Sequence, residues 1–353
     1  MQVKIILESE RDTWNSFVSS SGGSVLQSYE WGELKETVGW KPLRMVLLNE
    51  GEIVAGISVL KKSLPLPGRS IFYAPRGPIV PFDDQKLLGL LLEPLKGEAK
   101  RNKAVLLRTD PPIEEGHGVE EILKKNGFVR NSKQIQPRTT YYLDLKIDLD
   151  DLLKTFEEKT RYNIRLSERK GVQVRQANTL DGVRAYYDLY KETSARDNFL
   201  IHPLKYYQNI KNLLIDRGLA SVFLAYYKEK PIAGIFIFHF GKKIWYMYGA
   251  SSAEFRNVMP NHALHWHVIK WAKEAGYEIY DLWGIPSNPK EGHPLWGVYR
   301  FKKGFNGRLV KYIGVYDLPF NPILYHAFEK GLAFYKNMRS LIKKGKISDS
   351  LAE

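Results

Sequence analysis

Two long stretches of the chain repeat one pattern of hydrophobic and polar positions. Each begins with two apolar strands joined by a polar turn, a predicted hairpin, and Val54-Ala-Gly-Ile returns 178 positions later as Ile232-Ala-Gly-Ile. After each hairpin come a tyrosine-containing strand, a helix, a strand that runs into a proline turn, and a Lys/Gly/Phe element. The paired segments are 44–60 with 221–240, 72–77 with 245–250, 83–101 with 261–275, 105–112 with 278–286, and 124–128 with 302–305. A spacing kept over five elements predicts an internal duplication.

The repeat sets the predicted fold class and domains. Strands alternate with helices in both copies, so we predict an α/β (α+β) architecture of two similar domains, residues 1–147 and 148–316, with a cleft between them. Residues 317–353 are expected to pack back on the first domain. The glycine inside each repeated Ala-Gly strand predicts a β-bulge or the close approach of another backbone.

Charge and cysteine content narrow the functional classes. The 353 residues carry a formal charge of +14, which favours polyanionic partners such as nucleic acid, nucleotide-bearing substrates or an anionic membrane surface. The absence of cysteine excludes disulfides, a thiolate nucleophile and cysteine zinc sites. The N-terminus lacks the apolar core of a signal peptide, and no run approaches the ~20 apolar residues of a membrane span. We therefore predict a cytoplasmic protein.

Two basic segments are candidates for contact with a polyanion. Arg161, Arg165 and Arg169 have helical spacing and share one face of a predicted helix. The tail from about Tyr325 is amphipathic and rich in lysine. For this tail, the alternatives are a packed helix that frays into solvent and a segment that lies on a membrane surface or on RNA.

Further candidate residues lie in loops and at helix starts, where ligand contacts are common. Arg196 and His202 lie in a loop between two predicted helices of residues 183–216, and Tyr206 opens the second helix. Farther along, three histidines are close together, but only His262 and His265 share a helix face. With no cysteine and no HExxH motif nearby, we predict no metal site.

The order of hairpin, strand, helix and strand resembles the GNAT acyltransferase fold, present twice. That fold holds CoA with a glycine-rich loop, because backbone N–H groups at a helix N-terminus can approach a pyrophosphate. The matching loop of the second half reads Arg256-Asn-Val-Met-Pro-Asn-His-Ala, with Met259 and Asn261 where glycines are expected, and the matching region of the first half is acidic. An acyl-CoA donor is therefore disfavoured, and no cofactor is predicted.

Over nearly its whole length the chain resembles a narrower group, the FemABX peptidyltransferases, which are tandem GNAT-like enzymes that build peptidoglycan cross-bridges. The carriers are Ser28-Tyr-Glu-Trp-Gly-Glu-Leu-Lys, Tyr73-Ala-Pro-Arg-Gly-Pro, Arg161-Tyr-Asn-Ile-Arg, Arg196-Asp-Asn-Phe, Tyr248-Gly-Ala-Ser and Tyr299-Arg-Phe-Lys-Lys-Gly-Phe. The resemblance implies an aminoacyltransferase that uses aminoacyl-tRNA as donor and an amine of the peptidoglycan precursor as acceptor, at the inner face of the membrane. No coiled-coil arm is inserted, so the shorter form of the family is expected.

The resemblance also implies roles for individual residues. Lys302, with the Phe301 carbonyl, matches the position near the reacting ester, and Asp110 matches a carboxylate proposed as a base. Contacts with the UDP-linked or lipid-linked muropeptide are implied for Lys35, His202, Tyr206 and Tyr248, and Arg76 and Arg196 are further candidates for substrate binding. The family often has arginine in place of His202, so the carrier of the acceptor stays open. Arg161, Arg165 and Arg169 are the candidates for tRNA binding.

The chemistry itself needs few groups. An amine attacks an ester carbonyl, and a fixed cation such as Lys302 stabilises the tetrahedral oxyanion, an effect of about 3–4 kcal/mol for one oxyanion donor. A carboxylate such as Asp110 would speed proton removal by roughly 10²–10⁴-fold. Lys303 has the same charge as its neighbour, so the assignment between the two lysines stays open. The alternatives to this enzyme are an N-acyltransferase with a CoA or carrier-protein donor and a non-catalytic module that binds a polyanion or a membrane surface; no obligate protein partner is predicted.

Overall fold

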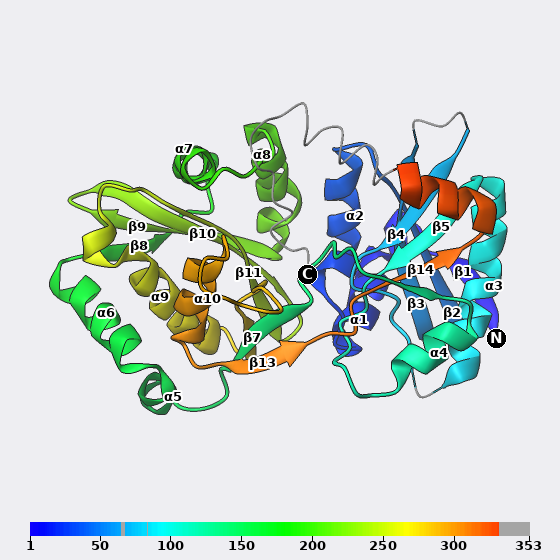
Figure 1. Ribbon diagram of the computed structural model, residues 1–353, viewed down its shortest axis with the longest axis horizontal. Helices are drawn as coiled ribbons and strands as arrows, with labels where there is room; N and C mark the ends of the chain where they lie inside the picture. The colour runs from blue at the N-terminus through cyan, green and yellow to red at the C-terminus, as the bar shows by residue number, and fades with distance from the viewer. Residues whose placement is uncertain (65–67, 83, 332–353) are drawn as a thin grey trace. The chain divides into compact units, whose positions relative to one another are not determined.

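The computed structural model describes residues 1–64, 68–82 and 84–331, and it divides the chain into two units (Figure 1). The first unit comprises Met1–Arg138 and the described residues from Lys311, and the second comprises Thr139–Val310. Within the described residues each unit contains one mixed sheet of seven strands. No helix in this part of the chain is both long and apolar enough to cross a membrane.

The first sheet has the strand order β1 (Gln2–Ile5), β2 (Lys41–Asn49), β3 (Glu52–Ser63), β4 (Ser70–Ala74), β5 (Ala104–Thr109), β14 (Val315–Pro319) and β6 (Val129–Asn131). The helices of this unit are α1 (Arg11–Ser20), α2 (Tyr29–Glu36), α3 (Gln85–Arg101) and α4 (Val119–Lys125). A further helix at residues 322–331 packs on β5 through Tyr325 and Phe328. The predicted tail continues beyond it, at residues 332–353, which lie outside the described residues.

The second sheet follows the order β13 (Arg308–Lys311), β7 (Thr139–Asp144), β12 (Ile279–Asp281), β11 (Lys243–Ser251), β10 (Lys230–Phe240), β9 (Ala220–Tyr227) and β8 (Gln173–Gln176). Its helices are α5 (Leu149–Thr155), α6 (Glu158–Arg169), α7 (Leu180–Asp197), α8 (Leu204–Leu213), α9 (Pro260–Glu274) and α10 (Trp296–Lys303). Local sequence fixes several of their starts: the hydroxyl of Thr179, for example, accepts a hydrogen bond from the Gly182 N–H at the start of α7.

Strand β10 is buried on both faces because alternate side chains meet helices on opposite sides of the sheet. Ile235 and Ile237 belong to the apolar core that also contains Leu264 of α9. Phe236 points the other way, and its ring centroid lies 4.6 Å from that of Tyr186 on α7. The continuous apolar run of this strand is therefore explained by two packed layers of helices.

The repeated Ala-Gly positions admit aromatic side chains. A Cβ atom added to Gly56 would lie 2.8 Å from the ring of Trp14 on α1, and one added to Gly234 would lie 3.0 Å from the ring of Tyr186 on α7. The close approach predicted at these glycines is present: side chains come nearest, and Gly56 also exchanges backbone hydrogen bonds with Ile79, each at 2.8 Å. Register shifts occur in both hairpins, between Leu47 and Leu48 and between Pro231 and Ala233.

The two sheets exchange one strand each. β5, β14 and β6 of the first sheet correspond in order to β12, β7 and β13 of the second. β7 follows β6 in the sequence but pairs with β12, whereas β14 follows β13 in the sequence but pairs with β5 and β6. The units therefore change at residues 138/139 and 310/311, and not at the predicted 147/148 and 316/317, because strand pairing assigns Thr139–Asp144 to the second sheet.

The exchange predicts which fragments fold. Residues 139–310 contain six strands of the second sheet and all of β13 but its last residue, whereas residues 148–316 lack β7 between β12 and β13. Each unpaired buried backbone group costs about 1–3 kcal/mol, so the loss of β7 removes several kcal/mol from a domain whose whole stability is ~5–15 kcal/mol. We expect cooperative urea unfolding for fragment 139–310 and none for fragment 148–316; equally cooperative transitions would contradict the exchange.

Candidate functional site

Lys302 lies at the carboxyl end of α10, and its side chain is almost completely buried. Its residue exposure is 5%. The Nζ atom donates hydrogen bonds to the carbonyl oxygens of Gly284 at 2.8 Å and Trp283 at 3.2 Å, and it lies 5.3 Å from the centre of the Tyr246 ring. Lys303, by contrast, is exposed. The structure therefore separates two lysines that the sequence left equivalent.

Burial controls the protonation of Lys302. Desolvation lowers the pKa of this ammonium from 10.5 to about 7, although the nearby Asp281 carboxylate favours the charged form. The carbonyl groups of Trp283 and Gly284 orient the amine without adding a full negative charge. A lysine of this kind can change its charge near neutral pH, which is a property of many catalytic lysines.

The carbonyl groups that hold Lys302 are set by a turn after β12. Asp281 is buried and accepts hydrogen bonds from the Thr140 hydroxyl at 2.6 Å and the Trp283 N–H at 2.7 Å. Trp283 adopts a left-handed backbone conformation with a φ of 59°, which is uncommon for a residue with a side chain and often marks a functional site. Asp281 thus holds the turn that carries both oxygen ligands of the lysine.

This turn lies where two parallel strands separate. The pairing of β11 with β12 ends at Trp245 and Asp281, while β11 continues to Ser251 along β10. The register of β11 against β10 shifts so that Met247 is an extra residue between Tyr246 and Tyr248. Ligand sites are common where neighbouring strands of an α/β sheet diverge, because backbone groups there are left accessible.

Sequence reasoning missed Asp281, Tyr246 and the neighbouring His265 as members of this site. His265 is buried, its Nδ1 atom lies 2.9 Å from the Tyr280 hydroxyl, and its ring centroid lies 4.5 Å from that of Tyr246. Burial and the charge of Lys302 lower the pKa of His265 well below its usual value. The sequence did contain one signal for Asp281. The run Asp-Leu-Trp-Gly begins at the end of a strand, in the same relative place as Asp110 in the first half.

The Phe301 side chain packs on a histidine-rich face of α9. Its ring packs against His262 at 5.1 Å and His265 at 5.2 Å between centroids, so the two histidines share a face of α9 as predicted. His267 instead packs near Phe223. Within residues 1–64, 68–82 and 84–331, no group of three or more histidine or acidic side chains is arranged to hold a metal ion.

The structure brings together three of the predicted substrate contacts of the second unit. The His202 ring stacks on the Tyr206 ring with centroids 4.0 Å apart, and the Tyr206 and Tyr248 side chains are hydrogen-bonded. Burial raises the pKa of both tyrosines. Arg196 lies at the end of α7, where its Nη1 atom donates to the Ser251 carbonyl at 2.7 Å. These contacts join α7, α8 and the end of β11.

The predicted residues of the first unit have different surroundings. Asp110 is 1% exposed and accepts hydrogen bonds from the Tyr73 hydroxyl at 2.8 Å and the Arg76 N–H at 2.7 Å. Burial raises its pKa, although the Arg76 charge and these donors oppose the shift. Arg76 itself is buried and donates to the Pro137 carbonyl at 2.6 Å. The contacts of Asp110 fit a carboxylate that fixes the end of β4 and the loop that follows it.

Lys35 is the second lysine with a strongly lowered pKa. Its side chain is half-buried and lies over the Trp31 ring, with the Nζ atom 4.5 Å from the ring centre. Desolvation lowers its pKa to about 8. A lysine prepared in this way can bind an anionic group more strongly than a hydrated surface lysine can, because its charge is already partly stripped of water.

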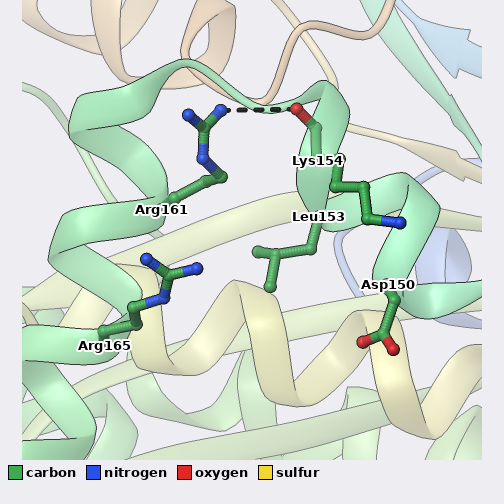
Figure 2. A pocket seen from close by; sticks show the side chains of 5 residues that line it. All are labelled: Asp150, Leu153, Lys154, Arg161 and Arg165. Carbon is green, nitrogen blue, oxygen red and sulfur yellow. Dashed lines mark hydrogen bonds between the residues drawn. The ribbon is translucent and has the colours of Figure 1, made fainter.

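The three arginines of α6 do not have the same surroundings. Arg161 is half-buried, and its Nη1 atom donates to the carbonyl oxygens of Phe156 and Lys154. Arg165 is exposed and lines a pocket together with Arg161 (Figure 2). Arg169 is exposed farther along the helix, and its guanidinium carbon lies 5.7 Å from the centre of the Tyr162 ring.

The loop before α9 has a glycine-like backbone but few free donors. Met259 adopts a left-handed conformation with a φ of 56°. Pro260 has no N–H, and the N–H groups of His262 and Ala263 both bond to the Met259 carbonyl, at 3.1 and 3.3 Å. The start of this helix therefore lacks the row of N–H groups that cradles a pyrophosphate.

The lowered pKa of Lys302 predicts a pH-dependent stability. Below pH 7 the lysine is charged in both the folded and unfolded states, so the folded state bears the full penalty of burying the charge. Between about pH 7 and 10.5 only the unfolded chain keeps the proton, and the free energy of unfolding therefore rises with pH, by at most ~1.4 kcal/mol per pH unit. Urea unfolding gives the free energy of unfolding of wild type and of Lys302→Met. From pH 7 to 10.5 the wild-type value should rise relative to that of the variant. A difference between the two that stays constant with pH would contradict the lowered pKa.

Comparisons with known proteins extend over nearly the whole described fold. The FemAB family model matches residues 8–121, 117–228 and 216–330. A lipid II:glycine glycyltransferase of Staphylococcus aureus (strain MRSA252) is 28% identical over 90% of this chain and 93% of its own length. The corresponding protein of Staphylococcus haemolyticus (strain JCSC1435) is 27% identical over 87% of this chain and 91% of its own length.

Solved structures of known proteins are also similar to this chain over most of its length. The crystal structure of FemX has a TM-score of 0.87 and 26% identity, and the match covers 93% of this chain and all of FemX. A tandem GNAT protein from the clavulanic acid biosynthesis pathway, with a TM-score of 0.53 and 11% identity over 91% of this chain and 99% of its own, shares the fold. The predicted tandem GNAT-like fold is confirmed, and the family matches span nearly every described element. The chain belongs to the FemAB family.

Proposed function

We propose that this protein transfers an aminoacyl group from aminoacyl-tRNA to an amine of a lipid-linked peptidoglycan precursor. The observation that carries the proposal is the buried Lys302 at the divergence of β11 and β12, in a chain that belongs to the FemAB family. The relatives named as lipid II:glycine glycyltransferases support a lipid-linked acceptor and glycine as the transferred amino acid.

The proposed reaction is an aminolysis. The neutral acceptor amine attacks the carbonyl carbon of the aminoacyl ester, and a tetrahedral intermediate with one negative oxygen forms. The C–O bond to the ribose then breaks, the ribose oxygen takes up a proton, and the acceptor nitrogen loses one, which leaves an amide. Protonated Lys302 stabilises the negative oxygen, and its contacts with the Trp283 and Gly284 carbonyls fix its position before the substrate binds.

The other predicted residues take supporting roles in this proposal. His202, Tyr206 and Tyr248 present aromatic and hydroxyl groups from one cluster and would bind the acceptor. Lys35, with its lowered pKa, would bind an anionic group of the acceptor. Asp110 would position Tyr73 and the Arg76 loop, a role that its buried contacts favour over that of a general base.

A CoA-dependent transferase is the weaker alternative. The start of α9 offers few free N–H groups, because Pro260 lacks one and two others bond to Met259. A donor held through its pyrophosphate would need such groups. An RNA donor presents its phosphates one at a time along a backbone, which suits the dispersed arginines of α6.

A transfer assay tests the proposal. It offers tRNA charged with labelled amino acids, glycine among them, together with UDP-linked and lipid-linked muropeptides. We expect label to move to the lipid-linked acceptor, and Lys302→Met to lower the rate constant by roughly 10²–10³-fold, because one oxyanion donor contributes about that much. Lys303→Met is the matched control: its lysine is exposed, so it should retain wild-type activity.

Three outcomes would count against the proposal. Transfer to the UDP-linked acceptor alone would overturn the lipid-linked acceptor. No transfer from tRNA, combined with tight binding of CoA, would favour a CoA-dependent transferase. Full activity of Lys302→Met would remove Lys302 from the chemistry.

A further inference from the structure

The second unit contains a pocket whose walls carry more positive than negative side chains. It has a volume of about 320 Å³ and is lined by Arg161 and Arg165 of α6 and by Asp150, Leu153 and Lys154 of α5. Figure 2 shows the two guanidinium groups on the same side of α6, with the α5 side chains across from them. This volume lies at the lower end of the ~300–1,000 Å³ range of small-molecule sites.

The two arginines of the pocket have different tasks. Arg161 donates to the Phe156 and Lys154 carbonyl groups and so closes the carboxyl end of α5, where carbonyl oxygens are left unpaired. This fixes one wall of the pocket. Within the described residues the Arg165 side chain has no hydrogen bond and no ion pair, so its guanidinium is available to a ligand. Lys154 also lines the pocket, but its ammonium is paired with Asp151 at 2.8 Å, so the two arginines supply the unneutralised positive charge.

These groups favour a carboxylate or a phosphate, because a guanidinium can donate two parallel hydrogen bonds to two oxygens of such an anion. Asp150 on the opposite wall limits the charge of that anion. Its carboxylate repels a doubly charged phosphomonoester more than a singly charged phosphodiester. The pocket therefore suits one internal phosphate of a polynucleotide better than a terminal phosphate.

A second observation lies on the same helix. Tyr162 is 54% exposed, and Arg169 lies against its ring. An exposed aromatic ring beside arginine is the combination that accepts an unpaired base by stacking. A membrane surface would instead favour an apolar rim, and Leu153 is the one apolar side chain that lines the pocket.

We propose that the pocket between α5 and α6 binds one backbone phosphate of the RNA donor and that Arg165 is its principal ligand. The inference rests on the proposed function, since it assigns to the pocket a part of the aminoacyl-tRNA that lies away from the reacting ester. The pocket then contributes to donor affinity and does not take part in the chemical step.

The test compares two donors. One is a full-length tRNA charged with glycine, and the other is a short RNA that keeps only the charged terminal nucleotides. For Arg165→Glu we expect KM for the full-length donor to rise roughly tenfold, as for loss of one charged hydrogen bond, with kcat unchanged. KM for the short donor should not change, and Arg165→Lys should restore most of the affinity.

Salt dependence gives an independent readout. Loss of one phosphate contact should reduce the slope of log affinity against log salt by about 0.7–0.9 for the full-length donor. Arg184→Glu makes the same charge change at an exposed position in the first turns of α7 and serves as the matched control. It should leave both the KM and the salt slope at their wild-type values.

The other outcomes distinguish failure of the proposed function from failure of the pocket assignment. If wild type transfers from neither donor, the proposed function fails. If wild type transfers and Arg165→Glu keeps a wild-type KM for the full-length donor, the pocket assignment is overturned while the function stands. An equal effect on both donors would also overturn it, because Arg165 would then act on the fold or the chemistry.

Two further probes identify another ligand. Inorganic phosphate that raises the Tm of wild type but not of Arg165→Glu, with KM for RNA unchanged, would reassign the pocket to a small anion. Binding to vesicles of phosphatidylglycerol that is lost in Arg165→Glu, again with KM unchanged, would reassign it to a lipid surface. Either result would overturn the RNA assignment.

Discussion

A buried ion pair joins two parts of the chain that are 209 residues apart. Both nitrogen donors of the Arg108 fork, Nε and Nη2, contact the Asp317 carboxylate at 2.7 Å, and Asp317 is completely buried. Asn131 and Tyr325 donate to the same carboxylate. Because an unpaired carboxylate in this position would be very unfavourable, the pair holds β14 between β5 and β6 and completes the first sheet.

Both halves have a buried aspartate at the end of the corresponding strand, but the two carboxylates have different surroundings. In each half, the strand that follows the long helix ends at a buried aspartate, Asp110 after β5 and Asp281 at the end of β12. Asp110 accepts hydrogen bonds from Tyr73 in β4 and from the loop of Arg76, whereas Asp281 holds the turn that presents two carbonyl groups to Lys302. Both halves thus have a buried carboxylate at the corresponding place, and among the described residues only the one in the second half stands beside a buried lysine.

Much of the fold could be predicted from sequence because it depends on local patterns. The duplicated hairpins, the helices that follow them and the glycines that admit aromatic rings all leave signals within a few residues. The strand exchange does not, because the apolar pattern of Thr139–Asp144 suits either sheet and only distant partners decide the pairing. Strand neighbours that are far apart in sequence are the least predictable part of such a fold.

The candidate site shows the same division. Lys302 was predicted by its place in a motif, but its difference from Lys303 depends on which side of α10 is buried, and that requires the packed structure. Tyr246 and His265 were missed because each looks like an ordinary core residue in sequence. Their significance comes from a lysine that lies 56 and 37 positions away in the chain and beside them in the fold.

The exchanged strands also determine the order in which the protein can be completed during synthesis. β5 and β6 leave the ribosome within the first 131 residues, but the strand that joins them is not made until residue 319. While residues 132–319 are being made, the first unit therefore has two open strand edges, which are sites of incorrect pairing. The second unit receives its exchanged strand first and can close earlier, so the C-terminal half of the protein is expected to be the first to reach its native structure.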